Sequence, residues 1–198
     1  MFERIPPRER RDLLIAWLAI SAAFTLIFVR SRVDLSIALI YFLISLLTVG
    51  VGFVLHEMAH KFAAMHFGYW AEFQRDDQML LVAVVLAALA GVVFAAPGAT
   101  VVYGTSVSKR ENGIISAAGP VMSLLLCIPF ALLALFGGQW FLVGVIGLFG
   151  LKVNAMLAAF NMLPVSVLDG RKVLAWNPAI FAVLIAGAFG LLYLTYLI

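Results

Sequence analysis

Residues 35–67 read LSIALIYFLISLLTVGVGFVLHEMAHKFAAMHF. The stretch is apolar as far as Leu55, and the polar sequence HEMAHK then occupies residues 56–61. Because roughly 20 apolar residues cross the hydrocarbon core of a bilayer, the run predicts a membrane-spanning helix with ionisable residues near its end. Gly68 follows, and glycine is a residue type at which such helices commonly stop.

The rest of the 198-residue chain has the same apolar character. Hydrophobic residues make up 65% and charged residues 12% of the sequence, whereas soluble domains have about 45–50% and about 25%. No stretch is long and polar enough to form a soluble accessory domain, so we expect residues 1–198 to be a single transmembrane domain. We attribute the net charge of +3 to membrane topology, and we expect a lipid bilayer and no nucleic acid as a partner.

The apolar runs predict an all-α integral membrane protein with about five to six transmembrane helices. Besides the run already quoted, they lie at 13–29, 79–96, 113–136, 140–162 and 178–198. If residues 113–136 and 140–162 each cross once, residues 79–108 must return to the side that they left. Between the second span and the span that contains Gly119–Pro120 we therefore expect a re-entrant helix followed by a short β segment, or else two short crossings.

The sequence His56-Glu57-Met58-Ala59-His60 has the H-E-x-x-H pattern. On an α-helix, positions i and i+4 are about 40° apart, so both imidazoles face one point and can bind one Zn²⁺. Glu57 can hold the attacking water and take its proton. Ionisable residues are costly within membranes, and a metal would be their natural partner. The alternative is a set of satisfied polar residues at a helix end near the interface.

Two histidines leave a catalytic zinc one protein ligand short. His66 lies on a different face of the helix from His60 and cannot share its metal. The acidic residues within 69–78 belong to a polar, interfacial loop, where a solvated role is favoured. Asp169 differs from them, because it follows an apolar run and precedes Gly170, which permits a tight turn.

Two motifs together resemble the site-2 protease family of intramembrane zinc metalloproteases. The first is His56–His60, and the second is Asn161-Met-Leu-Pro-Val-Ser-Val-Leu-Asp169-Gly170. Gly119–Pro120 is similar to a third, weaker family feature, and the resemblance covers roughly residues 50–175. Val165-Ser166-Val167 departs from the family pattern, because many members carry a second proline there. No PDZ-like or CBS-like insert is present.

The resemblance implies that Asp169 is the third zinc ligand beside His56 and His60, with one zinc ion per chain. It implies that Asn161 steadies the substrate or the developing oxyanion, while Glu57 is the catalytic base. The expected activity is that of a zinc metalloendopeptidase that cleaves transmembrane protein substrates, in regulated intramembrane proteolysis or in the clearance of membrane peptides. The alternatives are a polytopic membrane protein that binds or transports metal, and an inactive protease relative. The substrate, the regulation and the oligomeric state stay open.

Basic residues predict the orientation in the cell membrane. With a cytoplasmic N-terminus, the outer side receives Arg30 and Arg32. The inner side collects Arg4, Arg8, Arg10, Arg11, Lys61, Arg75, Lys109, Arg110, Arg171 and Lys172. This bias places the active site toward the cytoplasmic face and the C-terminus outside. Lys152, within a predicted span, either reaches toward the interface or lines a water path.

Overall fold

The computed structural model describes residues 4–29, 34–93, 97–104, 106–137 and 140–197. The chain divides into two compact units, one made of residues 1–54 and 72–101, the other of residues 55–71 and 102–198. The expectation of a single domain stays a prediction. Arg30 and Arg32, which the charge argument used, lie outside the described residues.

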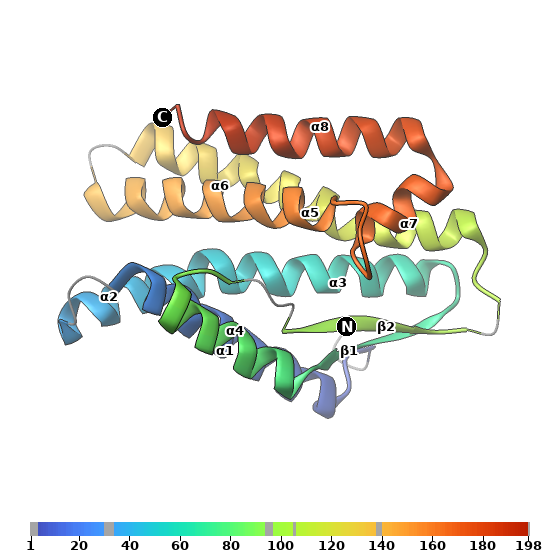
Figure 1. The fold of residues 1–198 in the computed structure, drawn as a ribbon, viewed down its shortest axis with the longest axis horizontal. Helices are drawn as coiled ribbons and strands as arrows, with labels where there is room; N and C mark the ends of the chain where they lie inside the picture. The colour runs from blue at the N-terminus through green and yellow to red at the C-terminus, as the bar shows by residue number, and fades with distance from the viewer. Residues whose placement is uncertain (1–3, 30–33, 94–96, 105, 138–139, 198) are drawn as a thin grey trace. The chain divides into compact units, whose positions relative to one another are not determined.

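Helices account for most of the described chain (Figure 1). In order, the elements are α1 (Pro7–Val29), α2 (Leu35–Ser45), the π-helix η2 (Leu46–Gly50), α3 (Val51–His66), β1 (Trp70–Arg75), α4 (Asp77–Ala90), β2 (Gly98–Tyr103), α5 (Lys109–Phe136), α6 (Phe141–Asn161), α7 (Asp169–Trp176) and α8 (Pro178–Leu194).

Four stretches of the described chain are helices long and apolar enough to cross a membrane. They are Pro7–Val29, Leu35–His66, Lys109–Phe136 and Phe141–Asn161. Two shorter apolar helices, α4 and α8, accompany them. The predicted class of all-α membrane protein is therefore confirmed, while the position of the two short helices relative to the bilayer stays a prediction.

The first unit is assembled around α1, which packs against α2, η2 and α4. The indole nitrogen of Trp17 donates a hydrogen bond to the carbonyl oxygen of Leu46 over 3.0 Å. Near the start of α1, the buried carboxylate of Glu9 accepts a hydrogen bond of 2.9 Å from the backbone nitrogen of Phe73. Glu9, which stands before the first apolar run at 13–29, is thus built into the fold.

Residues 69–78 are not a loop as predicted, because most of them form strand β1, which pairs with β2 in a two-stranded sheet; their interfacial position stays a prediction. Buried Ala71 and Phe73 alternate with less buried neighbours, which is the two-residue period of a strand. Asp76 then caps α4, since its carboxylate accepts hydrogen bonds from the two backbone nitrogens that open this helix. The predicted order of a helix and then a β segment within residues 79–108 is confirmed.

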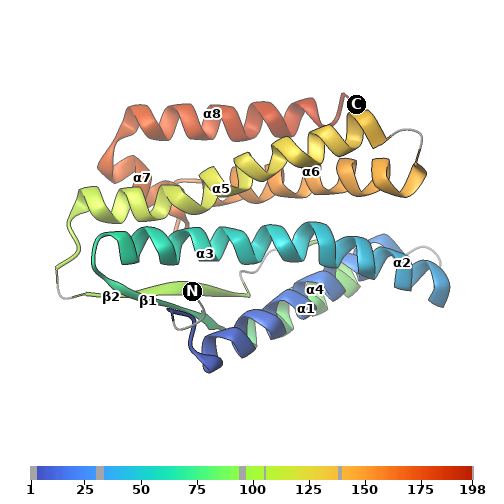
Figure 2. The same ribbon diagram turned by 180° about the vertical axis from the view of Figure 1, so that it is seen from behind.

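The second unit contains α5 to α8 (Figure 2). Helices α5 and α6 pack against each other, and Cys127, Phe130, Leu151 and Ala155 form a core between them. Gly150 lies against the ring of Phe130, so the two helices approach closely, as small residues allow in membrane proteins. Large apolar side chains on α5 remain exposed where lipid would contact them, namely Leu125, Ile128, Leu132 and Leu135.

The segment between the predicted spans 140–162 and 178–198 is not simply a loop, because α7 begins at Asp169. Gly170 serves a different purpose from the predicted turn: a Cβ atom there would collide with the backbone carbonyl of Met162. The glycine therefore allows α7 to start directly against the end of α6. Asn177 separates α7 from α8 and accepts hydrogen bonds from the first backbone nitrogens of α8.

Candidate metal centre

Helix α3 carries the H-E-x-x-H residues, and the part from Leu55 onward belongs to the second unit. His56 and His60 lie one turn apart, with their ring centroids separated by 4.8 Å. Both imidazoles and the carboxylate of Glu57 are buried. The potential ligand atoms of these three residues all lie within 4.8 Å of one another, so they could hold one metal ion.

Asp169, the first residue of α7, brings a carboxylate to the same point. Its Oδ2 atom lies 3.6 Å from Nε2 of His56 and 3.2 Å from Nε2 of His60. Zinc bonds of about 2.0–2.2 Å in tetrahedral geometry put neighbouring ligand atoms about 3.4 Å apart. Both distances from Asp169 are close to this spacing, so its carboxylate could join the two imidazoles around one metal ion.

The two imidazoles are oriented by helix α5. Nδ1 of His60 donates to the backbone carbonyl oxygen of Ile115 over 2.8 Å, and Nδ1 of His56 lies 2.9 Å from Oγ of Ser123. Because a carbonyl oxygen only accepts, Nδ1 of His60 carries a proton, and in the neutral imidazole the lone pair lies on Nε2, the atom that faces Asp169. A partner of this kind on the second ring nitrogen fixes the tautomer and the ring orientation of a metal ligand.

Gly119 completes this contact between α3 and α5. A Cβ atom built on Gly119 would meet Nε2 of both His56 and His60. Ile115, Gly119 and Ser123 are spaced four residues apart, so they lie along one stripe of α5. This stripe faces the two imidazoles, although it supplies neither a side-chain carboxylate nor an imidazole of its own.

The charge state of Asp169 suits a metal ligand. Burial disfavours the charged form of its carboxyl group, but the neighbouring imidazoles of His60 and His56 outweigh this and hold the pKa of Asp169 below its usual range. The group is therefore a carboxylate at neutral pH. A carboxylate together with two imidazoles is the ligand set of several catalytic zinc sites.

Not every residue singled out in the sequence joins this cluster. Asn161 ends α6, and its side-chain amide donates to the carbonyl oxygen of Leu157 in its own helix over 3.0 Å. Its placement beside the metal stays a prediction. His66 is exposed and contacts Phe67, as expected for a residue outside the site.

Two lysines place their amines near aromatic rings. Lys61, next to His60 and counted above among the cytoplasmic charges, is fully buried, with its amine 5.1 Å from the ring of Trp70. Lys152 is exposed, and its amine lies 3.8 Å from the ring of Tyr196. This contact agrees with the alternative in which the side chain reaches outward along an apolar surface.

Sequence reasoning missed the role of α5 in the site. Ser123 offered one signal, since it is a polar residue within an apolar span and is fully buried in the structure. The carbonyl of Ile115 offered none, because every residue carries a backbone carbonyl and only packing decides where it points. Gly119 was noticed as part of a motif, but its physical purpose is seen only in the contact with the imidazoles.

A membrane protein with a buried H-E-x-x-H helix and a converging carboxylate is a membrane metalloprotein of hydrolytic type. One relative is 40% identical to the chain over 180 residues, which is 91% of this chain and 90% of the relative. It comes from Methanocaldococcus jannaschii and carries the name "Putative zinc metalloprotease MJ0611". The chain belongs to the same family of zinc metalloproteases, and zinc is its cofactor. No family model and no solved structure matches it significantly.

Proposed function

We propose that this chain is an intramembrane zinc metalloprotease of the site-2 type, which hydrolyses peptide bonds of transmembrane protein substrates. One observation carries the proposal: two imidazoles and two carboxylates meet in a buried cluster, and the helix that bears three of them, Leu35–His66, is long and apolar enough to span a bilayer. A soluble metalloprotease would have no need to place its site on such a helix.

His56, His60 and Asp169 would hold the zinc ion. When bound, zinc supplies Lewis acidity, which brings the pKa of a water molecule toward neutrality and polarises a peptide carbonyl. Ile115 and Ser123 keep both Nε2 atoms aimed at the same point, so the site needs little rearrangement on loading.

Glu57 is the general base in this proposal. Its carboxylate is buried one residue after the first imidazole, with its oxygen in the same cluster as the two histidines. It takes a proton as water attacks the scissile carbonyl, and it then delivers that proton to the leaving amine. Asn161 would hold the substrate or the developing oxyanion through the second N–H of its amide, since only one is donated to Leu157.

A transmembrane substrate presents a particular obstacle, because its peptide bonds are protected within helical hydrogen bonds. The substrate must unwind locally before its carbonyl reaches the site. Glycine and proline weaken a helix, and we therefore expect them near the cleaved bond to favour hydrolysis.

The proposed orientation places the N-terminus and the metal centre toward the cytoplasm of the cell. It predicts that single cysteines introduced at the exposed positions Arg8 and Lys172 react with a membrane-impermeant maleimide from the same side. Cys127 is buried, so it gives little background. Labelling of the two positions from opposite sides would refute this topology.

The proposal is tested by measuring zinc content and cleavage in the same samples. The chain is purified in detergent, reconstituted into vesicles and offered a panel of epitope-tagged proteins with a single transmembrane helix. Wild type is compared with Glu57→Gln and Asp169→Ala. The matched control is Asp77→Asn, which alters an exposed acidic residue that pairs with Arg75.

Wild type and the control should hold one zinc per chain and cleave substrates whose helices contain glycine or proline. Glu57→Gln should keep its zinc and lose about 10²–10⁴-fold in rate, while Asp169→Ala should lose both zinc and activity. Cleavage of water-soluble peptides alone would show a metalloprotease that does not act within the membrane. Bound zinc without any hydrolysis would instead favour metal transport or an inactive relative.

A further inference from the structure

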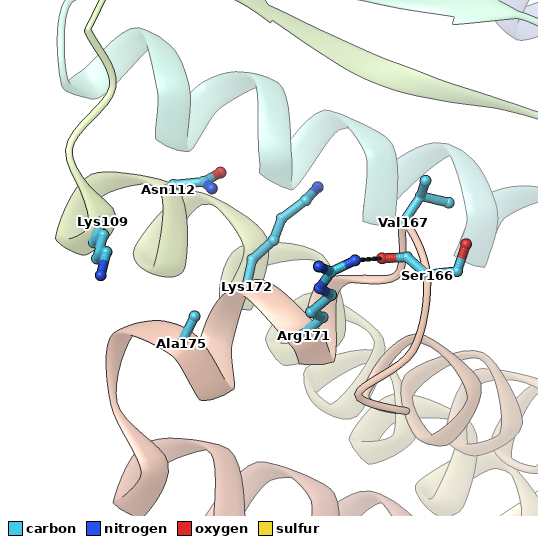
Figure 3. A pocket seen from close by; sticks show the side chains of 7 residues that line it. All are labelled: Lys109, Asn112, Ser166, Val167, Arg171, Lys172 and Ala175. Atoms are coloured by element: carbon cyan, nitrogen blue, oxygen red, sulfur yellow. Dashed lines mark hydrogen bonds between the residues drawn. The ribbon is translucent and has the colours of Figure 1, made fainter.

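A shallow pocket of about 440 Å³ lies beside helix α7 in the second unit. Its lining comes from the start of α5, from the loop before α7 and from α7 itself: Lys109, Asn112, Ser166, Val167, Arg171, Lys172 and Ala175. In Figure 3 the amine of Lys172 reaches between Asn112 and Val167, while the guanidinium of Arg171 lies against Ser166. No element of the zinc mechanism above uses this pocket.

The charged residues that line the pocket are all cationic. Lys109, Arg171 and Lys172 contribute three cations, and no carboxylate is among the residues that line it. The guanidinium of Arg171 is held by one hydrogen bond, 3.3 Å long, to the carbonyl oxygen of Ser166. Since a guanidinium has five N–H donors, most of them stay available for an anion.

The pocket is separate from the metal centre, although both depend on α7. Successive residues of an α-helix are about 100° apart, so Arg171 and Ala175 point away from the face that carries Asp169. Asp169 and Val173 are buried, whereas Arg171, Lys172 and Ala175 are exposed. Arg171 and Ala175 therefore lie on the face of α7 opposite Asp169, while Lys172 is about 60° from Asp169 around the helix and exposed.

The location indicates what kind of anion would occupy it. Lys109 opens α5, and α7 follows the end of α6, so the pocket lies at one end of two packed helices that are each long enough to span a bilayer. Such an end falls at the depth of lipid headgroups. Val167, which lines the pocket beside the cations, is 79% exposed, and Val165 in the same loop is 52% exposed, as suits a loop that touches acyl chains.

We infer that this pocket binds the phosphate headgroup of an anionic phospholipid. Basic pockets at the ends of transmembrane helices are known to hold such headgroups, and Arg pairs with phosphate through parallel hydrogen bonds. Lys172 and Lys109 supply further positive charge, and the exposed valines admit the lipid tails. The site requires no catalytic step and is independent of the proposed proteolysis.

Native mass spectrometry of the full chain in detergent tests the inference, with phosphatidylglycerol as the anionic lipid and phosphatidylcholine as the neutral one. The test variant is Lys109→Gln/Arg171→Gln/Lys172→Gln. Its control, Arg8→Gln/Arg10→Gln/Arg110→Gln, removes three exposed cations that do not line the pocket. Ala175→Trp fills the pocket without changing its charge, and it serves if the triple variant fails to fold by thermal unfolding and gel filtration.

Wild type and the control should bind one phosphatidylglycerol in preference to phosphatidylcholine. Because each cation is worth about fivefold in affinity for an anionic lipid, the triple variant should bind at least about tenfold more weakly, and Ala175→Trp should do the same. Equal losses in the test and control variants would overturn the inference. An unchanged affinity in both pocket variants would overturn it as well.

Two competitors separate the sources of the anion. Glycerol phosphate carries the same phosphate without tails, and it should displace the lipid only at concentrations far above that of the lipid. Displacement at a comparable concentration would assign the pocket to a soluble phosphate compound. Displacement by a polyglutamate peptide at low concentration would assign it to an acidic protein segment. Either result would overturn the lipid assignment.

Discussion

Gly119 lies so close to His60 that a Cβ atom at residue 119 would collide with the Nε2 atom of the imidazole. The same Cβ atom would also crowd Nε2 of His56. These two nitrogen atoms are the donors that the proposed zinc ion requires. The absence of a side chain at this one position of α5 therefore keeps the metal-binding position open.

Gly119→Ala should consequently lose zinc while most of the fold persists. An added methyl group in a close-packed site costs about 1–3 kcal/mol, which corresponds to roughly 5–150-fold in zinc affinity. Metal analysis and competition with a chelator measure the change. Gly187→Ala is the matched control, because a Cβ atom there has no neighbour within 4 Å. Full zinc binding by Gly119→Ala would refute the steric argument.

Ser123→Ala should weaken zinc binding without removing a ligand. The hydroxyl oxygen lies 2.9 Å from Nδ1 of His56, and loss of such a partner typically costs 10–100-fold in metal affinity. The affinity is measured by chelator competition at constant pH. Ser36→Ala, an exposed serine in the first turn of α2, should change nothing. If Ser123→Ala binds zinc as tightly as wild type, the hydrogen bond does not orient the imidazole.

Removal of zinc should lower the thermal stability of the protein. A metal that binds only the folded chain stabilises it by about 2.7 kcal/mol at a hundredfold excess over its Kd, so chelation should lower Tm by on the order of 5 °C. Asp169→Ala should melt at a temperature that does not respond to the chelator. A wild-type Tm that is equally insensitive would argue against a zinc ion bound across α3 and α7.

Tyr69 should titrate above the ordinary range of tyrosine. Its hydroxyl donates a 3.0 Å hydrogen bond to the carboxylate of Glu111, and this bond raises the pKa of the phenol. The raised pKa means that the stabilising contribution is complete below about pH 10, the value for an unfolded chain, and is lost as pH rises through the higher folded value.

Ultraviolet absorbance of the tyrosinate measures this titration, as the difference between wild type and Tyr69→Phe. Glu111→Gln should return the pKa of Tyr69 toward its ordinary value. Tyr193→Phe, which removes an exposed tyrosine, provides the control difference spectrum. A Tyr69 titration that is the same with and without the Glu111 carboxylate would show that the hydrogen bond is unimportant in solution.

Local patterns predicted the helical parts of the fold well. The H-E-x-x-H helix and its end just before Gly68 follow from spacing and from a glycine that adopts φ of 85°. Strand β1 was missed because its aromatic and charged residues suggested a segment at the membrane interface. In the structure, the burial of Ala71 and Phe73 shows the two-residue period of a strand. Helix α7 was missed because only eight residues form it, and they follow a loop with turn-like composition.

The candidate site was predicted in part and for identifiable reasons. The two imidazoles share one face because of helix geometry, which the sequence alone determines. The approach of Asp169 was available only through a family resemblance, because the distance between α7 and α3 depends on tertiary packing. The contacts of Ser123 and of the Ile115 carbonyl depend on how α5 packs against α3, and no local pattern encodes that.

The stripe on α5 has a practical consequence for anyone who wishes to transplant this metal centre into a designed membrane scaffold. Copying two histidines, a glutamate and an aspartate would leave the imidazoles free to rotate. A transplanted site would also need two turns of α5, from Ile115 to Gly119 and from Gly119 to Ser123, because these residues contact the imidazoles. Helix α5 contributes none of the proposed metal ligands, but its contacts fix the orientation of the two imidazoles that are among them.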